Sequence, residues 1–411
     1  MPKTVAIIGA LDTKGEDFAF LKAEIERRGC EAIVVDFSVV GTPGFAPDVP
    51  AAQVAAAGGA DLAALAAQAD RGAAMQAMTA GMVAVLRGLH AEGRIHGVIG
   101  MGGGGGTSVA AAAMRALPIG FPKLIVSTVA GGDVSGFVGL SDIVMMPSVL
   151  DVSGVNRVTR VIYTNAAGAI CGMVTGEVSA SDSRPAIAVS MFGNTTRAVQ
   201  HARKVLEAAG YEVLVFHATG AGGRQMEALI EAGLVDGVLD MTTTEWADEL
   251  CGGVLSAGPH RLEAAGRRGM PQVVVPGCLD MCNFWAPETI PAQYADRLFY
   301  HWNANVTLMR TTPAENARLG EIFAGKLNEA AGPVEVYIPQ GGWSELDVPG
   351  KPFYLPEANE AFITALKAHL KPSVRVVEMP QDINDEAFAQ AAARALLALM
   401  PQRSTTRGQA V

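Results

Sequence analysis

The sequence predicts an α/β protein built from two Rossmann-like, doubly wound domains that arise from an internal duplication, with a ligand cleft between them. Short apolar runs such as Thr4–Gly9 are typical of buried parallel strands. Each run is followed by a turn and a helical pattern, which is the order of a βαβ unit. After Ser181–Pro185 the pattern restarts, with Ala186–Met191 in the place of Thr4–Gly9. We therefore expect domains at 1–183 and 184–411.

Composition limits the classes of function. The net charge of −10 and the lack of a basic tract argue against DNA as a partner. No apolar run reaches the length of a membrane span, and the chain begins without a signal peptide, so we expect no membrane association. The five scattered cysteines fit a reducing cytoplasm. Cys278 and Cys282 lack the spacing of a closed zinc site, and no metal site is predicted.

The first domain is expected to alternate strands and helices. Its predicted strands are Thr4–Gly9, Ala32–Phe37, Gly97–Met101, Lys123–Thr128 and Asp142–Met146. Its predicted helices are Asp17–Arg28, a long helical region Ala51–His90 broken near Gly58 and Gly72, Val109–Leu117, and Asn156–Met173.

The strongest motif is a glycine run between a strand and a helix. Gly102, Gly103, Gly104, Gly105 and Gly106 are followed by Thr107 and Ser108. We expect a turn with positive φ, a helix capped by Thr107 or Ser108, and N–H groups that bind phosphate. A linker or a tight packing turn is the alternative. The run lacks the lysine of a P-loop, and its match to a dinucleotide fingerprint is weak.

Further candidates lie at the other strand ends of the first domain. Asp12, Thr13 and Lys14 occupy a polar turn Ala10–Gly15 after the first strand, where open α/β sheets bind ligands. Asp12 could hold a ribose, a magnesium ion or the helix N-terminus, and capping a helix is the commonest use of an Asp there. Lys14 is equally suited to be a solvated charge. Asp36, which ends the second strand, and a second glycine-rich loop with Gly131 and Gly132 complete the set of candidate contacts.

The second domain is expected to repeat this order with additions. Predicted strands are Ala186–Met191, Glu212–His217, Gly237–Met241, Gln272–Val275, Val334–Ile338 and Val374–Glu378. Predicted helices are Ala198–Ala209, Gln225–Glu231, Thr311–Lys326 and Asn384–Met400. Pro276–Trp285 is interpreted as a strand-end loop, and Gly341–Pro356 as a lid.

Candidate contacts in the second domain also follow strands. They are Asn194, Thr195, His217, Thr219, Gly220, Gly222, Gly223 and Asp280. The turn from Thr219 precedes a helix, so it could hold an anion. His217 is either an acid/base group or a hydrogen-bonded structural histidine. Glu245 and Asp248 either flank a cleft or stabilise the start of a helix.

Long strings in this chain resemble the Tm-1-like ATP-binding family, also called UPF0261. The strings are Ile8–Lys22, Gly100–Ser108, Phe216–Ile230, Val275–Trp285 and Asp347–Asn359. The resemblance implies two Rossmann-like subdomains, ATP bound between them, and a homodimer. A plant member of the family is a virus-resistance protein that inhibits viral RNA replication and carries an additional TIM-barrel domain, so a separate barrel protein is a candidate partner.

Two functions of different class follow. The first is an enzyme that uses ATP, with Mg²⁺ as a candidate companion ion, on a small-molecule substrate; no catalytic residue can be assigned. The second is a nucleotide-binding regulatory or scaffold protein without turnover. A dinucleotide oxidoreductase is weaker, because its glycine fingerprint belongs at the first βα turn, which here reads Gly9–Gly15.

Overall fold

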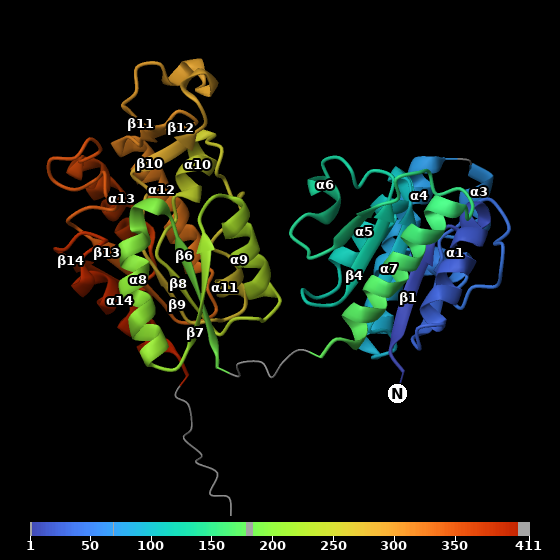
Figure 1. Ribbon diagram of the computed structural model, residues 1–411. Coiled ribbons are helices and arrows are strands. Elements are labelled where there is room, and N and C mark those ends of the chain that lie inside the picture. The colour runs from blue at the N-terminus through green and yellow to red at the C-terminus, as the bar shows by residue number, and fades with distance from the viewer. Residues whose placement is uncertain (1, 69, 178–183, 402–411) are drawn as a thin grey trace, which may run out of the picture. The chain divides into compact units, whose positions relative to one another are not determined.

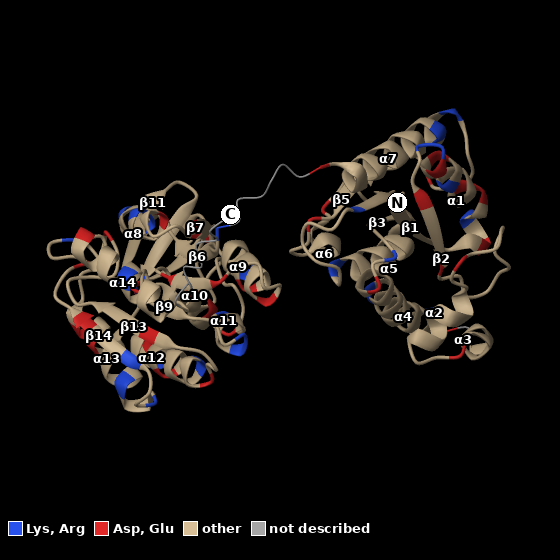
Figure 2. Cartoon of the chain, turned by 90° about the horizontal axis from the view of Figure 1, so that it is seen from below, with Lys and Arg blue, Asp and Glu red and all other residues tan. Residues whose placement is uncertain are grey.

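The computed structural model describes residues 2–68, 70–177 and 184–401. The chain forms two compact units, Met1–Ser181 and Asp182–Val411 (Figure 1). The predicted boundary residues Ser181–Ser183 lie outside the described residues. Lys and Arg are interspersed with Asp and Glu over both units (Figure 2).

Unit 1 is a doubly wound α/β fold, as predicted. Its five strands are all parallel and lie in the order β2-β1-β3-β4-β5. The strands are β1 (Thr4–Gly9), β2 (Glu31–Asp36), β3 (Gly97–Gly102), β4 (Lys123–Ser127) and β5 (Val144–Pro147). The helices are α1 (Leu11–Glu26), α2 (Ala51–Ala57), α3 (Leu62–Gln68), α4 (Arg71–Ala91), α5 (Gly104–Arg115), α6 (Ser135–Val138) and α7 (Arg157–Thr175).

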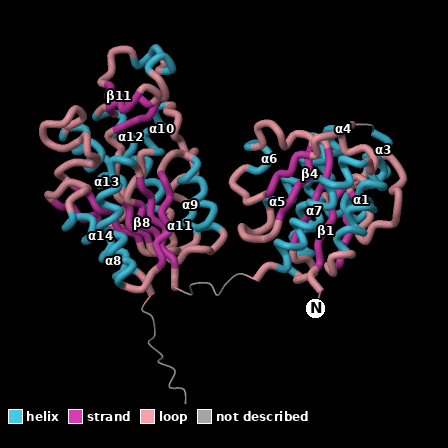
Figure 3. The backbone as a smooth tube through the Cα atoms, in the orientation of Figure 1, coloured by secondary structure: helices cyan, strands magenta, loops and turns pink. Residues whose placement is uncertain are grey.

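Two apolar cores lie on opposite faces of this sheet. Alternate side chains of a strand point to opposite faces. Val5 and Ile7 of β1 pack with α1 and α7, whereas Ala6 and Ile8 pack with α2, α4 and α5. Helices therefore cover both faces, as Figure 3 shows. Strands buried on both sides explain the continuous apolar runs in the sequence.

Unit 2 has the same strand order with one strand more. Its parallel sheet has the order β7-β6-β8-β9-β13-β14, which is 2-1-3-4-5-6 when its strands are counted in chain order from β6. The strands are β6 (Ala186–Met191), β7 (Glu212–His217), β8 (Gly237–Asp240), β9 (Gln272–Val274), β13 (Val334–Pro339) and β14 (Arg375–Met379). The shared order agrees with the predicted internal duplication.

The helices of unit 2 cover this sheet on both faces (Figure 3). They are α8 (Thr196–Ala208), α9 (Ala221–Glu231), α10 (Glu245–Cys251), α11 (Ala264–Arg267), α12 (Pro313–Asn328), α13 (Pro356–His369) and α14 (Glu386–Leu399), with short 3-10 turns η1 (Gly193–Thr195), η2 (Pro287–Thr289) and η3 (Ala292–Tyr294). Residues of α8 and α14 share one core, and residues of α10, α12 and α13 another.

An antiparallel sheet in unit 2 was not predicted. Strands β10 (Met281–Phe284), β11 (Phe299–Asn303) and β12 (Val306–Arg310) form it in the order β10-β12-β11. The interpretation of Pro276–Trp285 as loop is thus wrong for its last part. The stretch Gly341–Pro356, expected as a lid, buries Trp343, Asp347 and Phe353 completely, so much of it is part of the packed domain.

Three helix boundaries differ from the prediction in ways that matter for the site. Helix α1 begins at Leu11 directly after β1, so the expected polar turn at Ala10–Gly15 is instead the first part of a helix, with a kink at Lys14. Helix α5 begins at Gly104 and includes three of the glycines. Gly72 lies inside α4, which Asp70 caps through the N–H groups of Gly72 and Ala73.

Candidate functional site

A cavity of about 720 Å³ opens in unit 1 at the carboxyl ends of β1 and β3. These two strands are neighbours at the point where the chain order of the sheet reverses, which is the usual ligand position in doubly wound folds. The lining comes from the start of α1, the loop after β2, helices α3 and α4, and the β3–α5 junction. The residues are Ala10, Asp12, Thr13, Lys14, Phe37, Ser38, Val39, Val40, Leu65, Ala66, Asp70, Arg71, Ala74, Met75, Met101, Gly102, Gly103, Gly104, Gly105, Gly106 and Asp151.

The N-terminus of α5 faces this cavity without a protein cap. Gly103 is the N-cap residue in extended conformation (φ −78°, ψ −168°), and among the residues that the structure describes no side chain caps this helix. The first N–H groups of an α-helix have no acceptor within the helix. The N–H groups of Gly104, Gly105 and Gly106 are therefore donors available to a ligand, and the helix dipole favours an anion there.

The detailed prediction for this motif was partly wrong. None of the described residues Gly102–Gly106 has positive φ. Thr107 and Ser108 do not cap the helix: Thr107 Oγ1 is 2.6 Å from Ser127 Oγ, and Ser108 Oγ donates to Gly104 O at 2.9 Å. Close packing favours glycine most clearly at Gly102, where a Cβ would lie 3.3 Å from Gly106 Cα, whereas a Cβ on Gly104 would meet no atom within 4 Å.

The N-terminus of α1 is already neutralised by the protein. Asp36, almost completely buried, accepts a hydrogen bond from Leu11 N at 3.1 Å. Ser38 donates to the same Asp36 oxygen, and its own Oγ accepts from Asp12 N at 3.0 Å. Asp36 thus acts as the anion of α1 and does not line the cavity, contrary to its prediction as a ligand contact. A second negative group would be repelled here, so α5 is the better anion site.

Two cationic side chains line the cavity in different ways. Lys14 donates through Nζ to the carbonyl of Val152, so it is not simply a solvated charge. Arg71, in the first turn of α4, lies next to the start of α5: a Cβ on Gly105 would be 3.6 Å from Arg71 Nη2. Sequence reasoning missed Arg71, because nothing in the Ala-rich region around it indicates that α4 begins beside the glycines.

The remaining candidate residues of unit 1 differ in whether they line the cavity. Asp12 and Thr13 line the cavity, and Asp12 Oδ2 accepts from Gly41 N at 3.2 Å. Gly131 and Gly132 belong to the exposed loop between β4 and α6 and are not among the lining residues.

In unit 2, the helix N-terminus that we expected to bind an external anion binds a carboxylate of the protein. Gly220 N and Gly223 N donate to Glu245 Oε1 at 2.7 and 3.0 Å. A Cβ on Gly223 would lie 2.0 Å from Glu245 Oε2, and one on Gly222 would lie 1.9 Å from His217 O. Packing therefore accounts for glycine at these positions, and the N–H groups of Gly220 and Gly223 already have an acceptor within the protein.

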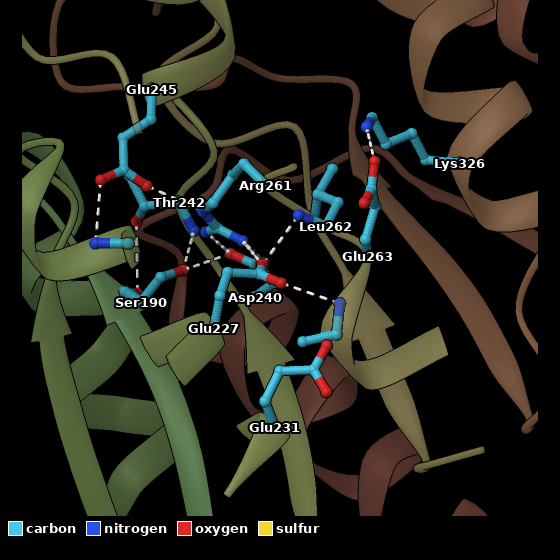
Figure 4. Close-up of polar contacts among 12 residues, drawn as sticks. Ser190, Glu227, Glu231, Asp240, Thr242, Glu245, Arg261, Leu262, Glu263 and Lys326 are labelled. Carbon is cyan, nitrogen blue, oxygen red and sulfur yellow. Dashed lines mark hydrogen bonds and ion pairs between the residues drawn. The ribbon is translucent and has the colours of Figure 1, made fainter. Parts of the chain in front are cut away.

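Glu245 belongs to a buried ion network centred on Arg261 (Figure 4). Arg261 contacts Asp240 through two nitrogens at 2.5 and 2.7 Å and Glu245 at 2.8 Å. Glu227 lies 3.2 Å from Arg261 and also accepts from Leu262 N and Ala264 N. Burial raises the pKa of Glu245, and Arg261 opposes this rise. The network lies at the carboxyl end of β8. The corresponding strand of unit 1 is β3, which is followed by the glycine run Gly102–Gly106.

A second cavity of about 550 Å³ lies in unit 2 beside the antiparallel sheet. Its lining residues are Phe192, Gly193, Asn194, His217, Thr219, Val254, Leu255, Asn283, Phe284, Trp285, Trp302, Asn303, Val306 and Leu308. Asn194, His217 and Thr219 were predicted as contacts. His217 packs edge-on against Phe192, with ring centres 5.7 Å apart.

Two other predicted contacts of unit 2 are buried away from this cavity. Thr195 Oγ1 is 2.7 Å from Thr242 Oγ1. Asp280 is completely buried and accepts from Ser344 Oγ at 2.7 Å. Burial, together with nearby Asp347, raises the pKa of Asp280 to about 7. Both side chains therefore make hydrogen bonds inside the domain and do not line the cavity.

Neither a metal-binding cluster nor a membrane-spanning helix is found in the part of the chain that the structure describes. Within residues 2–68, 70–177 and 184–401, no group of three or more His, Cys, Asp or Glu is placed to hold a metal ion. No helix among these residues has the length and apolar character needed to cross a bilayer.

The family models and the similar proteins all indicate the same protein family. The N-terminal domain model of the uncharacterised protein family UPF0261 matches residues 3–179, and its C-terminal domain model matches residues 184–400. A UPF0261 protein of Clostridium tetani is 49% identical over 97% of this chain and 100% of its own length. The ToMV resistance protein Tm-1(GCR237) of Solanum lycopersicum is 42% identical over 81% of this chain and 45% of its own length.

Comparison with solved structures does not extend this family assignment. UDP-N-acetylglucosamine 2-epimerase from Rickettsia bellii aligns over 97% of this chain and 96% of its own, at 12% identity and a TM-score of 0.23. A likeness of that size carries no argument about function. The two family models and the relatives together cover both units, and the chain therefore belongs to the UPF0261 family.

Proposed function

We propose that unit 1 binds ATP, with its phosphates at the N-terminus of α5. The single observation that carries this proposal is the uncapped glycine start of α5, which faces a cavity of about 720 Å³ at the reversal point of the sheet. The neighbouring N-terminus of α1 is neutralised by Asp36, which directs an incoming anion to α5. Arg71 supplies the positive charge that a P-loop would supply with its lysine.

The other walls of the cavity suit the rest of a nucleotide. Apolar side chains from the loop after β2 and from helices α3 and α4 provide a surface for a base, namely Val39, Val40, Leu65, Ala74 and Met75. Asp12 and Asp151 also line the cavity. Mg²⁺ is usually held by one or two carboxylates together with phosphate oxygens and waters, so Asp12 and Asp151 are the residues that would hold a nucleotide-bound Mg²⁺.

Two uses of bound ATP remain proposals. The first is an enzyme that uses ATP on a small molecule, which the separate cavity in unit 2 supports. The second is a nucleotide-binding regulatory or scaffold protein, with a TIM-barrel protein as candidate partner. Phosphate release from ATP, measured with and without candidate metabolites, separates them. The five free, buried cysteines support the cytoplasm as the location, and the high apolar fraction supports a homodimer.

Titration calorimetry with ATP, ADP, adenosine and NAD tests the proposal. Affinity should fall from ATP to adenosine, because adenosine lacks the phosphates that α5 would bind. At a hundred times its dissociation constant, ATP should add about 2.7 kcal/mol to the free energy of unfolding of unit 1. Equal affinity for ATP and adenosine, or a larger stabilisation by NAD than by ATP, would contradict the proposal.

A further inference from the structure

The cavity of unit 2 has a composition that differs from that of the nucleotide cavity. The lining residues, all of which the structure describes, include four aromatic rings: Phe192, Phe284, Trp285 and Trp302. They include no Lys, Arg, Asp or Glu, and His217 is their one ionisable side chain. A charged ligand would lose its hydration there without gaining a countercharge. The lining therefore favours an uncharged molecule with flat faces.

Two amide oxygens in this lining have no donor. Asn194 and Asn283 are 2% and 0% exposed, and the Oδ1 atom of each has no hydrogen-bond partner among the described residues. The orientation of Asn283 is fixed, because its Nδ2 donates to Asp248 Oδ2 at 2.6 Å. A buried acceptor without a donor destabilises a protein, and a ligand N–H or O–H group would satisfy it.

The surroundings keep these two amides in place. Asp248 Oδ1 accepts from Asn283 N and from Leu255 N at 3.1 and 3.0 Å, so both strand β10 and the Val254–Leu255 wall of the cavity are tied to one carboxylate. The backbone of Asn194 is held through its carbonyl oxygen, which accepts from Asn384 Nδ2 at 2.9 Å, and its side-chain Nδ2 donates to Met281 Sδ at 3.6 Å. The acceptors are thus preorganised on rigid parts of the domain.

We propose that this cavity binds an uncharged, flat heteroaromatic molecule that donates N–H groups to Asn194 and Asn283 and stacks on the tryptophans. Its volume of about 550 Å³ is within the usual range for small-molecule sites. All four tryptophans of the chain belong to unit 2, and Trp285 and Trp302, each about half exposed, line the cavity. The proposal uses no residue of unit 1 and does not depend on nucleotide binding.

Ligand-observed NMR titrations with benzimidazolone and indole, each paired with its N-methylated derivative, test this assignment. The N–H forms should bind to saturation, and methylation should weaken binding at least tenfold. Added ATP should not displace the probes. Equal binding of the N–H and N-methyl forms would overturn the role of the amides. Absence of saturable binding by all four probes would overturn the site.

Variants measured by ligand-observed NMR complete the test. Asn194→Leu should reduce the discrimination between N–H and N-methyl probes, and Trp302→Ala should weaken both members of each pair. Tyr354→Ala is the matched control, because Tyr354 is a similarly exposed aromatic residue of unit 2 outside the lining. Trp302 is exposed, so its variant keeps the test valid if Asn194→Leu fails to fold. Unchanged affinity in Trp302→Ala would contradict the proposal.

Discussion

Gly104→Asp should weaken ATP binding by roughly a hundredfold or more while leaving unit 1 folded. A Cβ at position 104 would meet no atom within 4 Å, so the new side chain enters open space. The helix dipole stabilises a carboxylate in the first turn by about 0.3–1 kcal/mol. The variant should therefore be at least as stable as the wild type.

The expected loss of affinity follows from the donors at this helix start. The new carboxylate would compete with phosphate for the N–H groups of Gly104–Gly106 and would repel it. Loss of two charge-assisted hydrogen bonds, each worth about 1.5–3 kcal/mol, costs at least about 3 kcal/mol. That corresponds to a loss of roughly a hundredfold or more in affinity.

Titration calorimetry with ATP on the wild type, Gly104→Asp and Gly104→Ala measures this effect. Gly104→Ala is the matched control, because it adds the Cβ without the charge and keeps all three N–H groups. It should bind ATP within a few-fold of the wild type. If Gly104→Asp folds and binds ATP as the wild type does, α5 does not hold the phosphates, and the reasoning is refuted.

Three further predictions concern unit 2 and assembly. Arg261→Met leaves Asp240 and Glu245 buried without their cation, so it should destabilise unit 2 by about 3–5 kcal/mol; urea unfolding followed by tryptophan fluorescence reports unit 2 alone, and a wild-type midpoint would contradict it. Burial raises the pKa of Asp248 to about 7, against an ordinary value of 3.8. The folded form thus retains a proton that the unfolded chain has lost, so this contribution to stability is complete below pH about 4 and is lost as pH rises to about 7. Asp248→Asn should make the fall in unfolding free energy over this window shallower by about 1.4 kcal/mol per pH unit, and an unchanged slope would show that Asp248 is ionised in the fold. We also expect a homodimer, which sedimentation at micromolar concentration would disprove by finding monomer alone.

The strands could be predicted from the sequence, whereas the helix starts at the site could not. Parallel strands buried on both faces leave an apolar run, as in Thr4–Gly9 and Ala186–Met191. Gly104–Gly106 lower the helix propensity of their segment, but packing of α5 against β3 and α4 overrides it. Leu11–Gly15 looks like a polar turn, yet Asp36 and Ser38 supply acceptors that allow a helix to begin there.

The corrections in unit 2 have a common cause, which is contact between residues distant in sequence. The Thr219–Gly223 turn has the composition of an anion site, but its anion is Glu245, which is more than twenty residues away. Arg261 shows no pattern that links it to Asp240 and Glu245. Strand β11 contains Phe299, Tyr300 and Trp302, which strands favour, but its side chains are mostly exposed and do not form a buried apolar run.

The most direct test of the proposed nucleotide site is an NMR titration of the full-length protein with ¹⁵N-labelled glycine. Addition of ATP should shift the amide signals of Gly104, Gly105 and Gly106. The amides of Gly220 and Gly223 are the internal control, because Glu245 already accepts their hydrogen bonds. Shifts confined to the α5 glycines are the result that we predict. Signals of Gly104–Gly106 that stay in place at saturating ATP would contradict the account.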